Sequence, residues 1–260
     1  MNQDKTRQDK ILEFWNQRAG FGVKAGSDDH VGKELEVAAL SRHLRDGMAV
    51  AEFGCGNGMT AIALAKAFDV RIVCFDFAPA MVDAARALAR ESGVGDRLMF
   101  GVADVADEPG LGGNFDVIYT QRMIINLPNW ASQARAIRYL LAHVKKGGHY
   151  LMCENSARAL AKLNELRQCA GLHDVTAPWH NVYLDDVAVA ELDLPDARLT
   201  EVEPFMGTYY FLSRVVNAWL AQREGKQPAY DAPVNELALR LPAFGDWSQT
   251  KLWVFQRNPG

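Results

Sequence analysis

The chain has 260 residues, of which 49% are hydrophobic and 23% charged, a composition typical of a protein with a sizeable packed core. Its formal net charge of −4 argues against a nucleic-acid-binding surface, because such surfaces are usually basic. No apolar run approaches the roughly 18 residues needed to span a membrane, and the polar start MNQDKTRQDK lacks the apolar segment of a signal peptide. The four cysteines show no CxxC spacing. We therefore expect a cytoplasmic protein with free thiols, no membrane span and no nucleic-acid partner.

The first half of the chain alternates strand-like and helix-like patterns. Residues 6–17 and 33–45 are predicted to form amphipathic helices, separated by a loop rich in Gly and Asp. Short apolar runs predict strands at 48–53, 71–77, 98–103, 115–120 and 149–154, with helices at 60–68, 80–92 and 130–144. The sequence KKGG at 145–148 is expected to end a helix and form a turn. This alternation predicts a parallel sheet with helices on both faces.

The second half is less regular. A helix is predicted at 157–169, followed by the aromatic, irregular segment GLHDVTAPWHNVYLDD. The run at 201–216 is expected to be a strand that continues into a helix, and 250–257 a final strand, the two pairing as an antiparallel edge. If Tyr209 and Tyr210 lie in that strand, they point in opposite directions. We expect one domain over 1–260, with a helical lid at 1–45, a cofactor-binding core at 46–154, a cap at 155–198, and edge strands with an insertion at 199–260.

The stretch VAEFGCGNGMTAIALAK joins a strand to a helix through three glycines. Gly54, Gly56 and Gly58 follow Glu52 at every second position, and a backbone without Cβ atoms can turn tightly and approach a ligand. A dinucleotide fingerprint would read GxGxxG instead. An acid near a helix N-terminus repels a pyrophosphate but suits a cationic ligand. S-adenosylmethionine carries an ammonium and a sulfonium and no phosphate, so the corner favours it over NAD.

Two further acids follow the next two strands. Asp76 stands about 20 residues after the glycine corner, where an acceptor for a ribose diol belongs. Asp104 follows the third strand and could accept from an adenine amino group. Either acid alone could be an ordinary turn or helix cap. Three such features in order, each at the C-terminal end of a strand, indicate a ligand site because ligands bind there in sheets of this kind.

On these motifs the chain resembles the class I S-adenosylmethionine-dependent methyltransferases. EFGCGNG is similar to the first motif of the family, FDFAPAMVDAA to the second, and FDVIYTQRMIINLPNW to the fourth. The resemblance implies an α/β Rossmann-like fold with a seven-stranded, mostly parallel sheet, an antiparallel last strand and a cap over the strand C-terminal ends. More loosely, QRMIINLPNW and ENSARALAKLNELR are similar to segments of methyltransferases of bacterial surface-polysaccharide biosynthesis, some of which act on a sugar phosphate or hydroxyl.

The family resemblance also implies the cofactor and its contacts. The cofactor is S-adenosyl-L-methionine, and the product S-adenosyl-L-homocysteine. The methionine part is assigned to Glu52, Gly54, Gly56, Gly58 and Gln121, and the ribose and adenine to Asp76, Phe77, Met81, Asp104 and Val105.

The acceptor side offers three candidate catalytic residues, His180, Arg122 and Tyr210, and Arg214 as a further possible anion contact. His180, in PWHN, could be a general base or an anion contact, or a histidine with only a packing role. Arg122 directly follows the fourth strand and could hold an anion, as could Arg214, although either could form an ordinary salt bridge. Tyr210 could line the pocket. No metal-ligand cluster is visible in the sequence, so we expect no metal.

Together these features predict an S-adenosylmethionine-dependent methyltransferase. We expect in-line transfer to an oxygen, hydroxyl or phosphate, of a small or saccharide acceptor, by a monomer or homodimer. An N-methyltransferase of a small metabolite and a catalytically silent cofactor-binding subunit remain as alternatives. A nicotinamide-dependent oxidoreductase is disfavoured by the glycine spacing and by Glu52.

Overall fold

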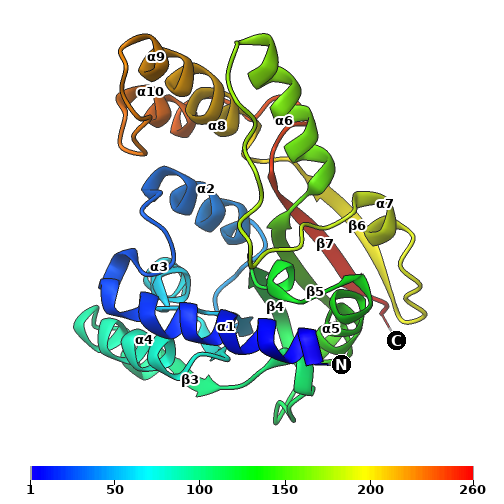
Figure 1. Cartoon of the computed structure of the whole chain (residues 1–260). Coiled ribbons are helices and arrows are strands. Elements are labelled where there is room, and N and C mark those ends of the chain that lie inside the picture. The colour runs from blue at the N-terminus through cyan, green and yellow to red at the C-terminus, as the bar shows by residue number, and fades with distance from the viewer. Residues whose placement is uncertain (1, 260) are drawn as a thin grey trace.

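The computed structural model describes residues 2–259, and its core is a seven-stranded sheet in the order β3-β2-β1-β4-β5-β7-β6 (Figure 1). Strands β1 to β5 are parallel, and β7 lies antiparallel between β5 and β6. The strands are β1 (Ala49–Phe53), β2 (Arg71–Asp76), β3 (Leu98–Val102), β4 (Phe115–Gln121), β5 (Val144–Asn155), β6 (Ala197–Glu203) and β7 (Thr250–Arg257). This confirms the expected Rossmann-like fold, including its antiparallel edge.

Helices cover both faces of the sheet because neighbouring strand residues point to opposite sides. In β4, Val117 and Tyr119 pack under α2 (His30–Ser41), α3 (Met59–Ala67) and α4 (Pro79–Glu91), whereas Ile118 packs under α5 (Trp130–Ala142). The α-helices are α1 (Asn2–Arg18), α2 (His30–Ser41), α3 (Met59–Ala67), α4 (Pro79–Glu91), α5 (Trp130–Ala142), α6 (Ala157–Cys169), α7 (Asp186–Ala190), α8 (Gly207–Tyr210), α9 (Asn217–Arg223) and α10 (Pro233–Glu236). Short 3-10 segments are η1 (Ala19–Lys24), η2 (Gly95–Arg97), η3 (Val105–Asp107), η4 (Ile124–Asn126) and η6 (Leu237–Leu239), and η5 (Phe211–Val216) is a π-helix.

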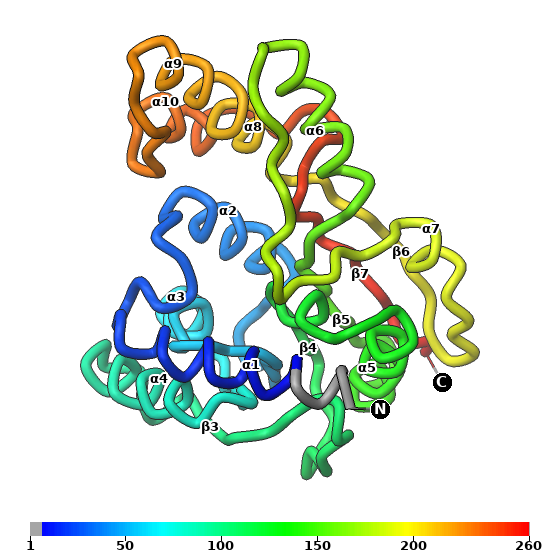
Figure 2. The backbone as a smooth tube through the Cα atoms, in the orientation of Figure 1, coloured from blue at the N-terminus to red at the C-terminus, as the bar shows by residue number. Residues whose placement is uncertain are grey.

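Two groups of helices lie outside the doubly covered sheet. In Figures 1 and 2, α1 crosses in front of the lower part of the molecule, and α6 with α8, α9 and α10 forms an upper part. The π-helix η5 contacts α6, α8, α9 and α10, so it lies at the centre of this upper part. Among residues 2–259, no helix has the length and apolar character that crossing a membrane requires. Cys55, Cys74 and Cys153 are buried, Cys169 is exposed, and all four are free.

Two local predictions were wrong. Residues 145–148 form no turn after a helix but belong to β5, which begins at Val144 with a shift of register against β4. Tyr209 and Tyr210 lie on helix α8, not on a strand, because β6 ends at Glu203. The next residue is Pro204, which has no N–H to donate to a strand partner, so the ladder stops there.

Candidate active site

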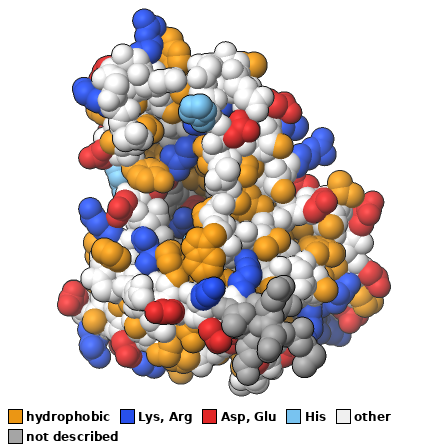
Figure 3. Space-filling model, in the orientation of Figure 1, with side chains coloured by type: hydrophobic (Ala, Val, Ile, Leu, Met, Phe, Trp, Pro, Cys, Tyr) orange, Lys and Arg blue, Asp and Glu red, His pale blue; other side chains and the backbone are white. Residues whose placement is uncertain are grey.

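A cavity of about 550 Å³ opens at the C-terminal ends of β1, β2, β4 and β5. This is the edge at which open α/β sheets bind ligands. Its walls come from α1, the loop before α2, the glycine corner, the turn after β4, the segment 178–183 and the η5 region. Figure 3 shows the molecule hollowed between its upper and lower parts, with basic side chains at the hollow. The volume is within the range of small-molecule sites.

The glycine corner forms one wall of this cavity. Gly54 has φ +77° and Gly56 has φ +51°, values that side chains other than glycine rarely adopt. A Cβ on Gly54 would lie 2.4 Å from Cγ of Met123, whereas a Cβ on Gly56 would meet no protein atom within 4 Å. Gly56 therefore borders open cavity and gives a ligand access to the backbone.

Gly58 has a different role from the one expected. It does not line the cavity. A Cβ there would lie 3.0 Å from Ala85 and 3.1 Å from Phe100, so this glycine permits close packing against α4 and β3. It also precedes α3 in a left-handed conformation, with φ +75°. The assignment of Gly58 to the methionine part is thus corrected to a packing and capping role.

Asp76 ends β2 and faces the cavity beside the glycine corner. Its Oδ2 accepts a hydrogen bond from the Gly56 N–H at 2.8 Å, and its Oδ1 accepts one from the Ala78 N–H at 2.9 Å. Each carboxylate oxygen has capacity for a further hydrogen bond. Burial raises the pKa of Asp76 to about 6. A buried acid with both oxygens part-used suits a pair of ribose hydroxyls.

Glu52 lies deeper in the same wall, with a relative exposure of 1%. Its Oε2 has no hydrogen-bond partner among the described residues. Burial raises the pKa of this carboxyl to about 8. Buried polar atoms are normally hydrogen-bonded, so this oxygen has room for a donor, either the neighbouring Tyr119 hydroxyl, which is also buried without a partner, or a ligand group in the cavity. The ammonium of a methionine group fits this requirement.

The expected adenine side is only partly as predicted. Asp104, Phe77 and Val105 line the cavity. Oδ1 of Asp104 accepts from the Ala106 N–H at 2.9 Å, so this acid also caps η3. Met81 does not line the cavity but packs in a buried cluster below it, at 1% exposure. Its assignment is corrected to the core.

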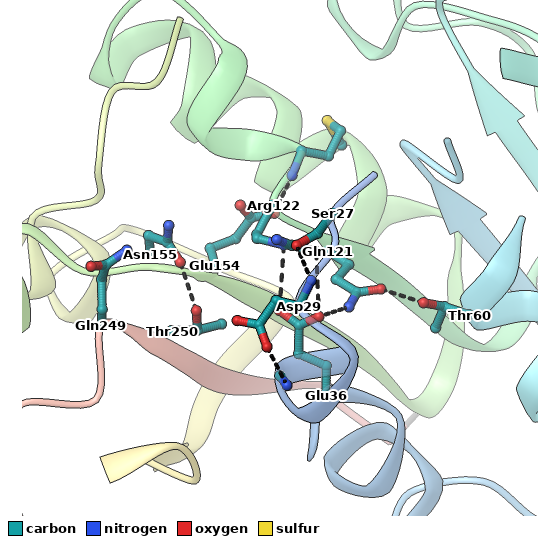
Figure 4. Close-up of polar contacts among 12 residues, drawn as sticks. Ser27, Asp29, Glu36, Thr60, Gln121, Arg122, Glu154, Asn155, Gln249 and Thr250 are labelled. Atoms are coloured by element: carbon teal, nitrogen blue, oxygen red, sulfur yellow. Dashed lines mark hydrogen bonds and ion pairs between the residues drawn. The ribbon is translucent and has the colours of Figure 1, made fainter. Parts of the chain in front are cut away.

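Beyond the glycine corner, a polar network joins β4 to α2 (Figure 4). The Thr60 hydroxyl donates to Oε1 of Gln121 at 2.6 Å, and the Gln121 amide donates to Glu36. Arg122 completes the network with its Nε 3.3 Å from Oε1 of Glu36. Gln121 and Arg122 both line the cavity, but their side chains are held by this carboxylate. The sequence reasoning missed Glu36, although an acid among the apolar positions of an amphipathic helix was the available signal.

The backbone at Arg122 is unusual. Its φ of +52° places a non-glycine residue in the left-handed region. The buried carboxylate of Glu154 stabilises the turn that follows by accepting from the N–H groups of Met123 and Ile124, each at 3.0 Å. Strained conformations of this kind persist where the surroundings fix them, and they cluster at functional sites.

His180 lies where α1 meets the segment 178–183. Its ring packs against Phe14 at 4.7 Å, Trp179 at 5.3 Å and Trp15 at 5.7 Å between centroids. Its Nδ1 is buried without a partner among the described residues. Burial, with Arg7 and Arg18 nearby, lowers its pKa, so the imidazole that lines the cavity is neutral at physiological pH.

Tyr210 also lines the cavity, but its hydroxyl is engaged by the protein. It lies 2.7 Å from Oγ1 of Thr250, which donates to Oδ1 of Asn155 at 2.8 Å (Figure 4 shows this last bond). Burial raises the pKa of Tyr210 well above its usual value. The geometry therefore gives Tyr210 a positioning role in the cavity wall, not that of a proton acceptor.

The segments that wall the cavity above the strand ends differ in part from the expected cap. The N-terminal segment is anchored where the Asn57 amide donates to the Gly22 carbonyl at 2.7 Å, and the Trp15 indole donates to Asn126 at 3.4 Å. No residue of α6 lines the cavity; Arg214 and Tyr230, which follow β6, occupy that side.

The comparisons with known proteins agree with this geometry. A model described as a methyltransferase domain matches residues 50–148. The chain is 30% identical over 202 residues to 27-O-demethylrifamycin SV methyltransferase of Amycolatopsis mediterranei, covering 74% of this chain and 70% of that protein. The chain is a class I S-adenosylmethionine-dependent methyltransferase. Phosphoethanolamine N-methyltransferase 1 of Arabidopsis thaliana is also 30% identical, over 52% of this chain and 28% of that protein.

Solved structures of similar fold cover more of the chain than the residues 50–148 that match the methyltransferase domain model. Magnesium protoporphyrin IX methyltransferase from Synechocystis PCC 6803, solved with bound S-adenosylhomocysteine, gives a TM-score of 0.60 at 15% identity, covering 96% of this chain and 95% of that one. A [4+2]-cyclase gives a TM-score of 0.58 at 19% identity, over 86% of this chain and 80% of that one. At such identities the likeness shows the fold alone.

The methyltransferase uses S-adenosylmethionine as its cofactor. Three residues of the cavity wall fit it: Glu52 has a carboxyl oxygen without a partner, Asp76 can accept further hydrogen bonds, and Gly56 leaves its backbone accessible. No group of three or more His, Cys, Asp or Glu side chains within residues 2–259 is arranged to hold a metal ion. None of the relatives named above carries a name tied to polysaccharide, so that narrower resemblance has no support from them.

Proposed function

We propose that this methyltransferase methylates an oxygen atom of a small acceptor and that His180 takes the acceptor's proton. S-adenosylmethionine supplies a methyl group on a sulfonium, which is already electrophilic. Alignment of the acceptor therefore accounts for much of the rate. A hydroxyl acceptor needs, in addition, somewhere to send its proton as the new oxygen–carbon bond forms.

The observation that carries the proposal is the neutral imidazole of His180 in the cavity wall. A neutral ring can accept a proton, and its lowered pKa keeps it neutral at the pH of the cell. Tyr210 and Arg122 do not compete for this role, because their polar atoms are engaged by Thr250 and Glu36. The rings of Phe14, Trp15 and Trp179 pack around the imidazole and hold its orientation.

The names of the relatives support an oxygen acceptor but include a nitrogen acceptor as well. The relative from Amycolatopsis is named for a 27-O position, and a 25% identical relative from Arabidopsis is a tocopherol O-methyltransferase. The phosphoethanolamine enzyme is an N-methyltransferase. An amine acceptor is therefore the second candidate function.

The test is methyl transfer from labelled S-adenosylmethionine to a panel of phenols, alcohols, saccharides and amines. For a hydroxyl acceptor, His180→Ala should lower kcat by about 10²- to 10⁴-fold, with partial recovery at high pH and unchanged S-adenosylhomocysteine affinity. His173→Ala, at an exposed histidine, is the matched control. Label found only on amines, or a His180→Ala rate equal to wild type, would refute the proposal. Cofactor binding without transfer to any acceptor would point to a silent binding subunit.

A further inference from the structure

Arg214 projects into the cavity from the upper part of the molecule, in a wall different from that of His180. It belongs to the π-helix η5, and only 23% of its side chain is exposed. Its guanidinium lies 4.9 Å from the ring centre of Tyr230 and 5.8 Å from those of Tyr209 and Tyr210. The charge is thus largely removed from water and walled by three aromatic rings.

The guanidinium makes no hydrogen bond to another described residue. The nearest acid is Asp29, whose Oδ2 lies 3.6 Å from Nη2 of Arg214. That carboxylate forms an ion pair with Arg214 and is shared with two other donors, since its Oδ1 accepts from the Gly32 N–H at 2.8 Å and its Oδ2 accepts from the Tyr209 hydroxyl. A guanidinium has five N–H donors, so several of those of Arg214 face the cavity and are free to bind a ligand.

The other cations of the cavity wall are committed to the protein. Arg122 is paired with Glu36. Arg18 donates to the Ala25 carbonyl, and Lys33 donates to the Val23 carbonyl at 3.2 Å. Among these four cations of the cavity wall, Arg214 is the one whose side chain makes no hydrogen bond to a described residue, and its ion pair with Asp29 is long at 3.6 Å.

The backbone that carries Arg214 is itself unusual. A π-helical turn is rare and often marks a functional site. Here Arg167 donates to the Arg214 carbonyl, and the Ser213 hydroxyl donates to the Tyr209 carbonyl at 2.7 Å. These contacts hold the π-turn in place and aim Arg214 at the cavity.

We propose that Arg214 binds an anionic oxygen group, a carboxylate or a phosphate, that the acceptor carries away from its methylated atom. The planar guanidinium matches both groups with paired hydrogen bonds. Because Asp29 offsets part of the positive charge, recognition depends on these hydrogen bonds more than on net charge. The assignment rests on the proposed function, in which the acceptor occupies this cavity.

The test is calorimetric binding of simple probes to the protein loaded with S-adenosylhomocysteine. Wild type should bind benzoate at least about tenfold more tightly than benzamide, and should also bind inorganic phosphate. Arg214→Gln should remove this preference and leave S-adenosylhomocysteine affinity unchanged. Arg223→Gln makes the same charge change on α9, where Arg223 lies over Trp219 outside the cavity wall, and should keep the preference.

Arg214→Lys separates geometry from charge, since it should bind phosphate weakly and lose most of the benzoate preference. A stronger response to benzoate or to phosphate in wild type tells which anion the site favours. If wild type binds neither anion more tightly than a neutral probe, the proposal is overturned even if no variant folds. A folded Arg214→Gln protein that still binds benzoate more tightly than benzamide also overturns it. If the protein binds anions at Arg214 but transfers no methyl group, the proposed function is refuted and this inference stands. If methyl transfer occurs and its rate does not depend on Arg214, this inference is refuted and the proposed function stands.

Discussion

Arg122, at the end of β4, reaches the buried carboxylate of Glu36 in α2, with 3.3 Å between Nε and Oε1. Burial raises the pKa of Glu36, and Arg122 opposes that rise. The pair ties α2 to the end of the sheet. The arginine directly after the fourth strand therefore forms an ion pair within the protein, which is one of the two roles that the sequence left open for it.

Removing one member of this pair should destabilise the fold. Arg122→Ala leaves the Glu36 carboxylate buried and unpaired, and should lower the free energy of unfolding by about 2–3 kcal/mol, less than for a fully buried pair because Arg122 is one-third exposed. Urea unfolding measures this. Lys226→Ala, which breaks an exposed pair with Glu224, should leave the free energy of unfolding nearly unchanged. Equal losses in the two variants would show that the Glu36 pair is not structural.

Asp76→Ala should weaken S-adenosylhomocysteine binding by roughly 1–3 kcal/mol, because it removes hydrogen bonds to two ribose hydroxyls. The structure adds a second effect, since Asp76 also accepts from the Gly56 N–H and so shapes the glycine turn. Calorimetric titration gives the affinity, and Asp83→Ala on α4 is a control with the same loss of charge. Unchanged affinity in a folded Asp76→Ala protein would refute the ribose assignment.

Glu52 should make the stability of the cofactor-free protein fall as pH rises. Its pKa is about 8 in the folded state and near 4.5 otherwise, so between these values the folded protein holds the extra proton. The free energy of unfolding should then decrease between about pH 5 and pH 8, by at most about 1.4 kcal/mol per pH unit for this group. Burial shifts the pKa of Asp76 and Glu154 in the same direction.

Glu52→Gln should flatten this dependence, because a neutral amide needs no proton to stay buried. Urea unfolding of wild type and variant across that pH range is the measurement. A wild-type stability that rises with pH over the same range would show that Glu52 is ionised and satisfied in the free protein.

Alanine substitutions at Gly56 and Gly58 should have different effects, the first mainly on cofactor binding and the second mainly on stability. Gly56→Ala should cost about 1 kcal/mol of stability for its positive φ, yet abolish most cofactor binding because the methyl group enters the cavity. Gly58→Ala should cost more stability, since its Cβ meets Ala85 and Phe100 at 3.0 and 3.1 Å. Thermal unfolding and calorimetry check both variants. Tight S-adenosylhomocysteine binding by Gly56→Ala would contradict the site.

The parallel core, and the meeting of Glu52, Gly56 and Asp76 at one wall of the cavity, followed from local patterns in the sequence. Apolar runs and glycine spacing lie within a few residues of one another, so Glu52, Gly56 and Asp76 could be placed on neighbouring strand ends. The partners of Arg122 and Tyr210 could not be predicted from the sequence, because Glu36 and Thr250 are brought to them by tertiary packing.

The region after β6 was the hardest to predict. Its aromatic and β-branched residues favour a strand, but Pro204 stops the ladder and packing places Tyr209 on a helix. The π-turn that carries Arg214 could not be predicted from the spacing of apolar residues, because it depends on tertiary contacts such as the hydrogen bond from Arg167.

The most direct test of the account is a crystal structure of the protein with S-adenosylhomocysteine. We predict its ribose hydroxyls on Asp76, its amino group on Glu52, and its sulfur open to the part of the cavity lined by His180 and Arg214. A sulfur atom turned away from both side chains, or a cofactor bound outside this cavity, would contradict the account.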